Sequence, residues 1–151
     1  MRELRRVLLA EDNARDLELT MAALEEHRLA NEVDVVRDGE QAWEYLEQLG
    51  RSPGSPSVYP ALVLLDLKMP KMDGLEVLRR MRGDERLRTV PVVMLTSSRE
   101  ERDIVESYRL GVNAYVVKPV AFEDFMKAVR TLGLFWAVLN QPPPGGARRA
   151  A

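Results

Sequence analysis

Cysteine is absent from this 151-residue chain. That absence excludes disulfides, zinc sites built from thiolates and a cysteine nucleophile, and it is compatible with a reducing compartment. An excess of one charge is also lacking, because the net charge is −2 and the pI is about 5.6. Nucleic-acid binding driven by bulk charge is therefore not expected. The single histidine, His27, is expected to face solvent near the end of a helix.

Long apolar runs are missing as well. The longest, residues 132–139, is too short to span a bilayer. Only four consecutive apolar residues, 7–10, follow the basic start before Glu11, which is too few for a secretory signal. We therefore expect a soluble, cytoplasmic protein. Hydrophobic residues make up 46% of the chain, which is enough for the core of one domain. We expect this domain to cover residues 1–140, followed by a disordered tail, 141–151, that is rich in proline and glycine.

Short apolar runs alternate with amphipathic stretches, a pattern that predicts repeated strand–helix units. The predicted strands cover residues 6–10, 33–36, 62–66, 92–96 and 114–117. Four of the predicted helices cover residues 14–28, 39–50, 99–110 and 120–140. A further helix begins after the capping residue Asp73, and its inner face would carry Leu75, Leu78 and Met81. Segment 51–60 predicts a surface loop, either a tolerated insertion or a partner-binding loop.

Three of the strands, 6–10, 62–66 and 92–96, are apolar at consecutive positions rather than at alternate ones. Such strands are covered on both faces, which predicts a parallel sheet between two layers of helices. Right-handed crossovers then give a doubly wound α/β fold, whose ligands bind beyond the carboxyl ends of the strands. Polar residues follow four of the apolar runs at that edge: Glu11 and Asp12, Asp66, Thr96, and Lys118.

Asp66 is the candidate nucleophile, because a carboxylate can attack a phosphoryl group and hold it as an acyl phosphate. Capping a helix would be its ordinary role, but no helix is predicted directly after it. Glu11 and Asp12 are candidate magnesium ligands, since Mg²⁺ prefers oxygen ligands in octahedral geometry. The alternative is a solvated acidic turn that caps the first helix.

Thr96 and Lys118 complete the candidate site. The Thr96 hydroxyl can bond to a phosphoryl oxygen, although an ordinary β-branched strand residue is the simpler alternative. Lys118 offers a positive charge to a phosphate, although it could instead be a surface lysine. A lysine placed between an apolar strand and Pro119 is poorly explained as a surface residue. Each signal is weak alone, and the four in this order point to phosphoryl chemistry on an aspartate.

The chain resembles the receiver domains of bacterial two-component response regulators. The matching stretches are LLAEDN at 8–13, LLDLKMPKMDG at 64–74, PVVMLT at 91–96 and AYVVKP at 114–119. The resemblance covers about residues 5–139. It implies a flavodoxin-like five-stranded parallel sheet with strand order 2-1-3-4-5.

The resemblance also implies the roles of individual residues. Asp66 would accept a phosphoryl group from a phosphohistidine on a sensor histidine kinase. Mg²⁺ would be bound by four groups: Glu11, Asp12, Asp66 and the backbone carbonyl of Lys68. Thr96 and Tyr115 would form the switch pair, and Lys118 would contact the phosphoryl group.

Two further features are similar to the single-domain regulators paired with bacterial phytochromes: VRDGEQA at 36–42 and Trp136 near the end of a long last helix. The chain departs from chemotaxis-type receivers at Lys68, where a smaller polar side chain is common, and we expect an altered rate of dephosphorylation. Glu11 replaces a frequent aspartate, which should move that metal contact towards a water bridge.

We expect no output domain after the last helix, so this helix suggests how the protein could act. One face, expected to cover the sheet, carries Phe122, Phe125, Met126, Val129, Leu132 and Trp136. The last turns are apolar nearly all round, and such a helix must be buried somewhere. A homodimer through this helix is the expectation, with packing inside the same chain as the alternative.

Other functions remain open at this point. The protein could carry a phosphoryl group within a phosphorelay. It could be a magnesium-dependent hydrolase of the haloacid dehalogenase type, although those enzymes want a second acid where this chain has Lys68. It could also be a degenerate receiver that acts only as a dimeric scaffold. We expect a receiver that phosphorylates and dephosphorylates itself, and no turnover of external substrates.

Overall fold

The computed structural model describes residues 6–26, 32–51, 59–97 and 101–118, together with 123, 124 and 127. The predicted tail, nearly all of the predicted last helix, His27 and most of the 51–60 loop lie outside the described residues. The expected boundary at residue 140 and the apolar face of the last helix therefore stay predictions. No helix within the described ranges is long and apolar enough to cross a membrane.

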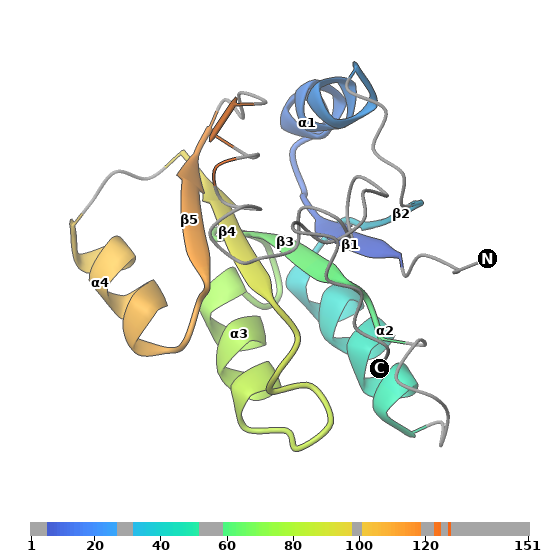
Figure 1. Ribbon diagram of the computed structural model, residues 1–151, viewed down its shortest axis with the longest axis vertical. Helices are drawn as coiled ribbons and strands as arrows, with labels where there is room; N and C mark the ends of the chain where they lie inside the picture. The colour runs from blue at the N-terminus through green and yellow to red at the C-terminus, as the bar shows by residue number, and fades with distance from the viewer. Residues whose placement is uncertain are drawn as a thin grey trace, which may run out of the picture.

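Five parallel strands form one sheet in the order β2-β1-β3-β4-β5, which confirms the predicted fold (Figure 1). The strands are β1 (Val7–Ala10), β2 (Val33–Val36), β3 (Leu62–Asp66), β4 (Val92–Thr96) and β5 (Ala114–Val117). The helices between them are α1 (Ala14–Glu26), α2 (Gly39–Arg51), α3 (Gly74–Arg82) and α4 (Glu101–Arg109). The strand order reverses between β1 and β3, so the carboxyl ends of these two strands flank the expected ligand site.

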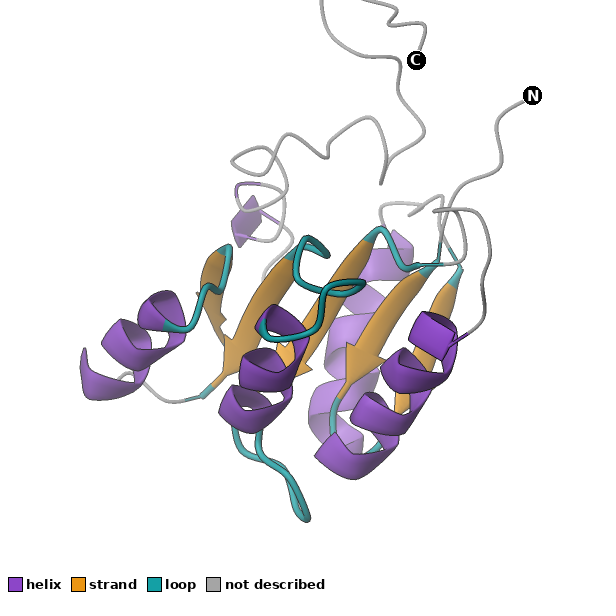
Figure 2. Ribbon diagram, turned by 90° about the horizontal axis from the view of Figure 1, so that it is seen from below, coloured by secondary structure: helices purple, strands orange, loops and turns teal. Residues whose placement is uncertain are grey.

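Helices cover both faces of the sheet, as Figure 2 shows. α1 packs through Leu24, with Leu17 and Met21 beside it, against one face. α2 and α3 pack through Leu46, Leu78 and other apolar side chains against the opposite face. All residues of β1, β3 and β4 are buried, because consecutive side chains point alternately into the two cores.

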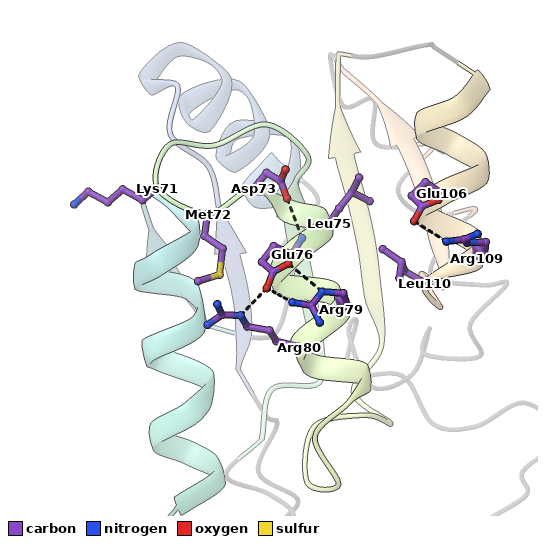
Figure 3. A pocket seen from close by; sticks show the side chains of 10 residues that line it. All are labelled: Lys71, Met72, Asp73, Leu75, Glu76, Arg79, Arg80, Glu106, Arg109 and Leu110. Atoms are coloured by element: carbon purple, nitrogen blue, oxygen red, sulfur yellow. Dashed lines mark hydrogen bonds and ion pairs between the residues drawn. The ribbon is translucent and has the colours of Figure 1, made fainter.

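The inner face of α3 differs slightly from the prediction. Leu78 and Met81 are buried as expected, together with Val77, whereas Leu75 is only half-buried. Leu75 instead lines a groove of about 550 Å³ between α3 and α4 (Figure 3). A helix turns by about 100° per residue, so a rotation of the buried stripe by part of a turn exchanges one apolar position for another.

Side-chain caps fix the starts of three helices at the carboxyl edge of the sheet. Asn13, Asp38 and Asp73 each accept a hydrogen bond from the backbone N–H three residues further on, at 2.8–2.9 Å. Such caps satisfy N–H groups that have no partner within the helix. The cap at Asp73 was expected from the sequence and is confirmed.

Two glycines let the backbone close tightly around this edge. A Cβ atom on Gly39 would lie 1.7 Å from the carbonyl oxygen of Met72, and one on Gly74 would lie 2.3 Å from that of Asp66. Both distances are shorter than any real contact, so only glycine fits. The start of α2 and the start of α3 are thereby pressed against the loop that follows β3.

Candidate phosphoacceptor and metal site

Three carboxylates meet at the reversal point of the sheet. Ala10 of β1 pairs with Leu65 of β3, so the next residues, Glu11 and Asp66, lie side by side. Oxygen atoms from Glu11, Asp12 and Asp66 lie within 4.8 Å of one another. Glu11 and Asp66 are buried, and Asp12 is half-buried. The predicted convergence of these three side chains is confirmed.

Lys118 provides the cation of the site. Its side chain is only 8% exposed, and its Nζ lies 2.6 Å from Glu11 Oε1 and 3.2 Å from Asp66 Oδ2. A third carboxylate, Asp16, lies 2.9 Å away through Oδ2. Burial alone would lower the pKa of Lys118, but the hydrogen bonds and charges of these carboxylates raise it. The ammonium therefore stays charged.

One ammonium does not neutralise this number of carboxylates. Burial, and then the adjacent Glu11 carboxylate, raise the pKa of Asp66 to about 7 even though Lys118 opposes the shift. The site thus holds more negative charge than its own cation offsets. A cluster of oxygen donors with excess negative charge suits a hard divalent cation such as Mg²⁺. The donor set therefore fits the expected metal.

Arg37 holds the backbone of the acidic pair, Glu11 and Asp12. Its Nε donates to the backbone carbonyl of Glu11 and its Nη2 to that of Asp12, both at 3.1 Å. The guanidinium contacts carbonyl oxygens here, so it holds the loop in place without pairing with the carboxylates. Arg37 directly follows β2, 25 residues or more from the two carbonyls that its guanidinium contacts, and no sequence pattern indicated this role.

The remaining predicted residues lie around the same edge. Thr96 is buried at the end of β4, one residue beyond the register partner of Asp66, and its carbonyl accepts from Lys118 N at 2.8 Å. Tyr115 of β5 is half-buried against the core beside α2 and α3. Lys68 follows β3 with an exposed side chain. The structure thus brings Thr96 and Lys118 to the site, whereas Tyr115 packs against the apolar core.

The groove between α3 and α4 is a different feature (Figure 3). Its arginines are already paired: Arg79 and Arg80 with Glu76, and Arg109 with Glu106. The two nearby guanidinium groups lower the pKa of Glu76. Four basic and three acidic side chains line the groove, so their charges nearly offset one another. At the site described above, which we call the acidic cleft, one ammonium instead faces the carboxylates of Glu11, Asp12, Asp16 and Asp66.

Comparison with known proteins identifies the class. The profile of the response regulator receiver domain family matches residues 7–130. The chain belongs to this family, and it is a signalling module rather than a turnover enzyme. The hydrolase alternative is thereby set aside.

Individual relatives show which members of the family the chain resembles. The chain is 60% identical to the bacteriophytochrome response regulator AtBRR, with a TM-score of 0.79, over 92% of this chain and 99% of that one. It is 40% identical to "Probable methanogenesis regulatory protein FilR2" of Methanothrix harundinacea over 91% of this chain and 86% of the relative.

Rcp1 of Synechocystis sp. provides a third comparison. This response regulator is 39% identical over 86% of the present chain and 87% of its own length. Its crystal structure in the Mn²⁺-bound form matches with a TM-score of 0.69 and 38% identity, over 88% of this chain and 94% of that one. The chain is therefore similar to phytochrome-associated single-domain receivers.

Proposed function

We propose that Asp66 accepts a phosphoryl group from the phosphohistidine of a sensor histidine kinase. An Asp66 oxygen forms the new O–P bond while the P–N bond breaks, and the bonding pair stays with the leaving imidazole. The observation that carries this proposal is the meeting of Asp66, the acidic pair and Lys118 at the reversal point of the sheet.

The donor set also supports a metal role. Glu11, Asp12, Asp66 and the Lys68 carbonyl would hold Mg²⁺, and the Mn²⁺-bound form of Rcp1 supports a divalent cation in a similar protein. When bound, the cation supplies positive charge next to the phosphoryl oxygens. Lys118 supplies a second positive charge from β5 and orients one of those oxygens.

A switch would follow from the added charge. Phosphorylation brings roughly two negative charges and three acceptor oxygens to the site. Thr96 would bond one of these oxygens by moving inward, and Tyr115, only half-buried now, would rotate into the vacated space. The surface of α4 and β5 would change as a result.

The partners follow from the family and the similarity. Receivers act with histidine kinases, and the similarity to AtBRR favours a phytochrome-type kinase. Such a kinase uses ATP, which places the proposed exchange in the cytoplasm.

The output would be a homodimer through the α4 region and the last helix of a receiver domain spanning 1–140, with 141–151 as a tail. Two large apolar side chains on α4, Val105 and Tyr108, are 57% and 51% exposed and support association there.

Phosphotransfer tests the assignment of Asp66. A bacteriophytochrome kinase labelled with radioactive phosphate should transfer its label to the wild type and not to Asp66→Asn. Asp84→Asn is the matched control, because it removes a carboxylate from a turn away from the cleft and can keep the hydrogen bond to Arg86 N. Equal labelling of Asp66→Asn would reject the phosphoacceptor.

Sedimentation tests the dimer. Val105→Glu should weaken association measured with and without beryllofluoride, since it puts a charge on the proposed α4 contact. Leu19→Glu is the control, because Leu19 is 46% exposed on α1. A monomer at high concentration under both conditions would reject the dimer.

The exposed Lys68 side chain is proposed to modulate the lifetime of the acyl phosphate, either by shielding it from water or by pairing with it. Lys68→Asn should change the rate of label loss from the phosphorylated protein. Lys71→Asn is the control, since Lys71 lies in the same loop and pairs with Asp38 at 3.8 Å. An unchanged lifetime in Lys68→Asn would remove this role.

A further inference from the structure

Asp16 lies in the acidic cleft although its position on α1 gives no sign of it. It is the third residue of α1, and its backbone N–H is capped by Asn13 Oδ1 at 2.9 Å. Its carboxylate reaches across to Lys118, 102 residues away in the chain, with an Oδ2–Nζ distance of 2.9 Å. The Asp16 side chain is 33% exposed, whereas that of Lys118 is 8% exposed.

Asp16 accepts a hydrogen bond from the lysine, and Glu11 and Asp66 form ion pairs with it. An ammonium has three N–H groups. The Lys118 ammonium has three carboxylates within 3.2 Å: Glu11, Asp16 and Asp66. A phosphoryl oxygen at Asp66 therefore competes with these carboxylates for the charge and the N–H groups of Lys118.

Asp16 is the partner that can be released at least cost. Glu11 is fully buried, so its carboxylate would lose a charge partner without gaining water. Asp66 carries the phosphoryl group itself and stays in the site. Asp16 is a third exposed and can be hydrated when the lysine moves away.

We propose that Asp16 is a positioning residue that holds Lys118 towards α1 in the unphosphorylated protein and competes with the phosphoryl group for the ammonium. This inference rests on the proposed phosphorylation of Asp66. Its effect is to weaken binding of a phosphoryl-like anion. The alternative is that Asp16 only stabilises the start of α1, where acidic side chains favour the helix dipole.

Beryllofluoride binding in excess Mg²⁺ separates the two roles, with ¹⁹F NMR reporting the bound fluoride. Asp16→Asn should bind beryllofluoride about three- to tenfold more tightly, because the competing carboxylate is gone. Asp16→Glu keeps the charge on a flexible stem and should restore the wild-type dissociation constant. Glu18→Gln removes an exposed acid from the same helix and should leave it unchanged.

Circular dichroism melts of the same four proteins report the helix role independently. Equal dissociation constants for Asp16→Asn and the wild type would overturn the inference, as would weaker binding by Asp16→Asn. A similar gain in Glu18→Gln would also overturn it, because general charge and not the Lys118 contact would then be responsible. A wild type that binds no beryllofluoride would instead reject the proposed function, and the inference with it.

Discussion

Asp34 and Asp66 are carboxylates on strands of the same sheet, but their surroundings act on them in opposite directions. Asp34 of β2 accepts two hydrogen bonds from Arg6, both at 2.6 Å, and a third from the Tyr45 hydroxyl. These contacts, led by Arg6, lower the pKa of Asp34. At Asp66, burial and Glu11 raise the pKa to about 7.

The difference separates a structural carboxylate from a functional one. The edge-strand cluster of Arg6, Asp34 and Tyr45 is satisfied within the chain, so it ties β1 to β2 and α2 and needs no ligand. The acidic cleft is left with uncompensated negative charge, which costs stability unless something positive binds. A strongly shifted pKa in a cleft marks a candidate functional site, because a sequence selected for stability alone would not keep a destabilising charge there.

The largest expected effect comes from removing the destabilised charge. Asp66→Asn should raise the free energy of unfolding of the metal-free protein by as much as about 4 kcal/mol at pH 8, because each unit of pKa shift is worth about 1.4 kcal/mol. Between pH 4 and 7 the folded wild type holds a proton that the unfolded chain has lost. Its stability therefore falls as the pH rises through this window.

Urea denaturation across that pH range in EDTA measures the effect. The gain in Asp66→Asn should shrink towards zero near pH 4. Glu40→Gln, which removes an exposed acid from α2, is the control and should give no such pH-dependent gain. A constant difference at every pH would contradict the electrostatic cause.

Binding of Mg²⁺ should offset the excess negative charge of the site and so stabilise the protein. Mg²⁺ at a hundred times its dissociation constant should stabilise the wild type by about 2.7 kcal/mol, since it binds the folded state alone. Asp12→Asn and Asp66→Asn should respond less, and EDTA should remove the gain. Stabilisation of both variants equal to that of the wild type would place the metal elsewhere.

Arg37 offers a sharper contrast with Arg6. Both are arginines beside acidic residues, but Arg37 donates to backbone carbonyls of the acidic loop. Arg37→Gln should weaken Mg²⁺ binding about tenfold by loosening that loop. Arg109→Gln, on α4, is the control for losing one exposed positive charge. Isothermal titration calorimetry with Mg²⁺ measures the affinities. Equal affinities for Arg37→Gln and the wild type would show that the Arg37 contacts have only a structural role.

The smallest effect is expected at the edge-strand cluster. Asp34→Asn should cost about 1 kcal/mol at pH 7, reduced by the partial exposure of the pair to solvent. Because the folded pKa of Asp34 is lowered, this stabilisation exists above the unfolded pKa and is lost as the pH falls below it. Mg²⁺ affinity should not change. A loss of metal binding would mean that the two clusters are coupled.

Much of this site could be predicted from the sequence, because the residue that follows each apolar strand falls at the same edge of a parallel sheet. Apolar runs ending in Glu11, Asp66, Thr96 and Lys118 required only a parallel sheet to bring these residues together. Asp16 and Arg37 were not foreseen, because one reads as an ordinary first-turn acid and the other as a loop arginine. Their roles depend on the distance between α1 and β5 and between β1 and β2, which periodicity does not encode.

The tight approach at Gly39 was also out of reach of sequence reasoning. The sequence predicted a helix over 39–50, and α2 does begin at Gly39. Nothing in the pattern showed that the Met72 carbonyl would occupy the space of a Cβ atom there. Likewise, the exchange of Leu75 for Val77 on the buried face of α3 depends on how the helix rotates against its neighbours.

The carboxyl ¹³C resonance of Asp66, titrated by NMR in the metal-free protein, tests the central claim most directly. We predict a pKa of about 7 for Asp66, with Asp34 titrating below its ordinary value in the same sample. An Asp66 pKa near 4, equal to that of a solvated aspartate, would show that the cleft carries no electrostatic deficit and would contradict this account.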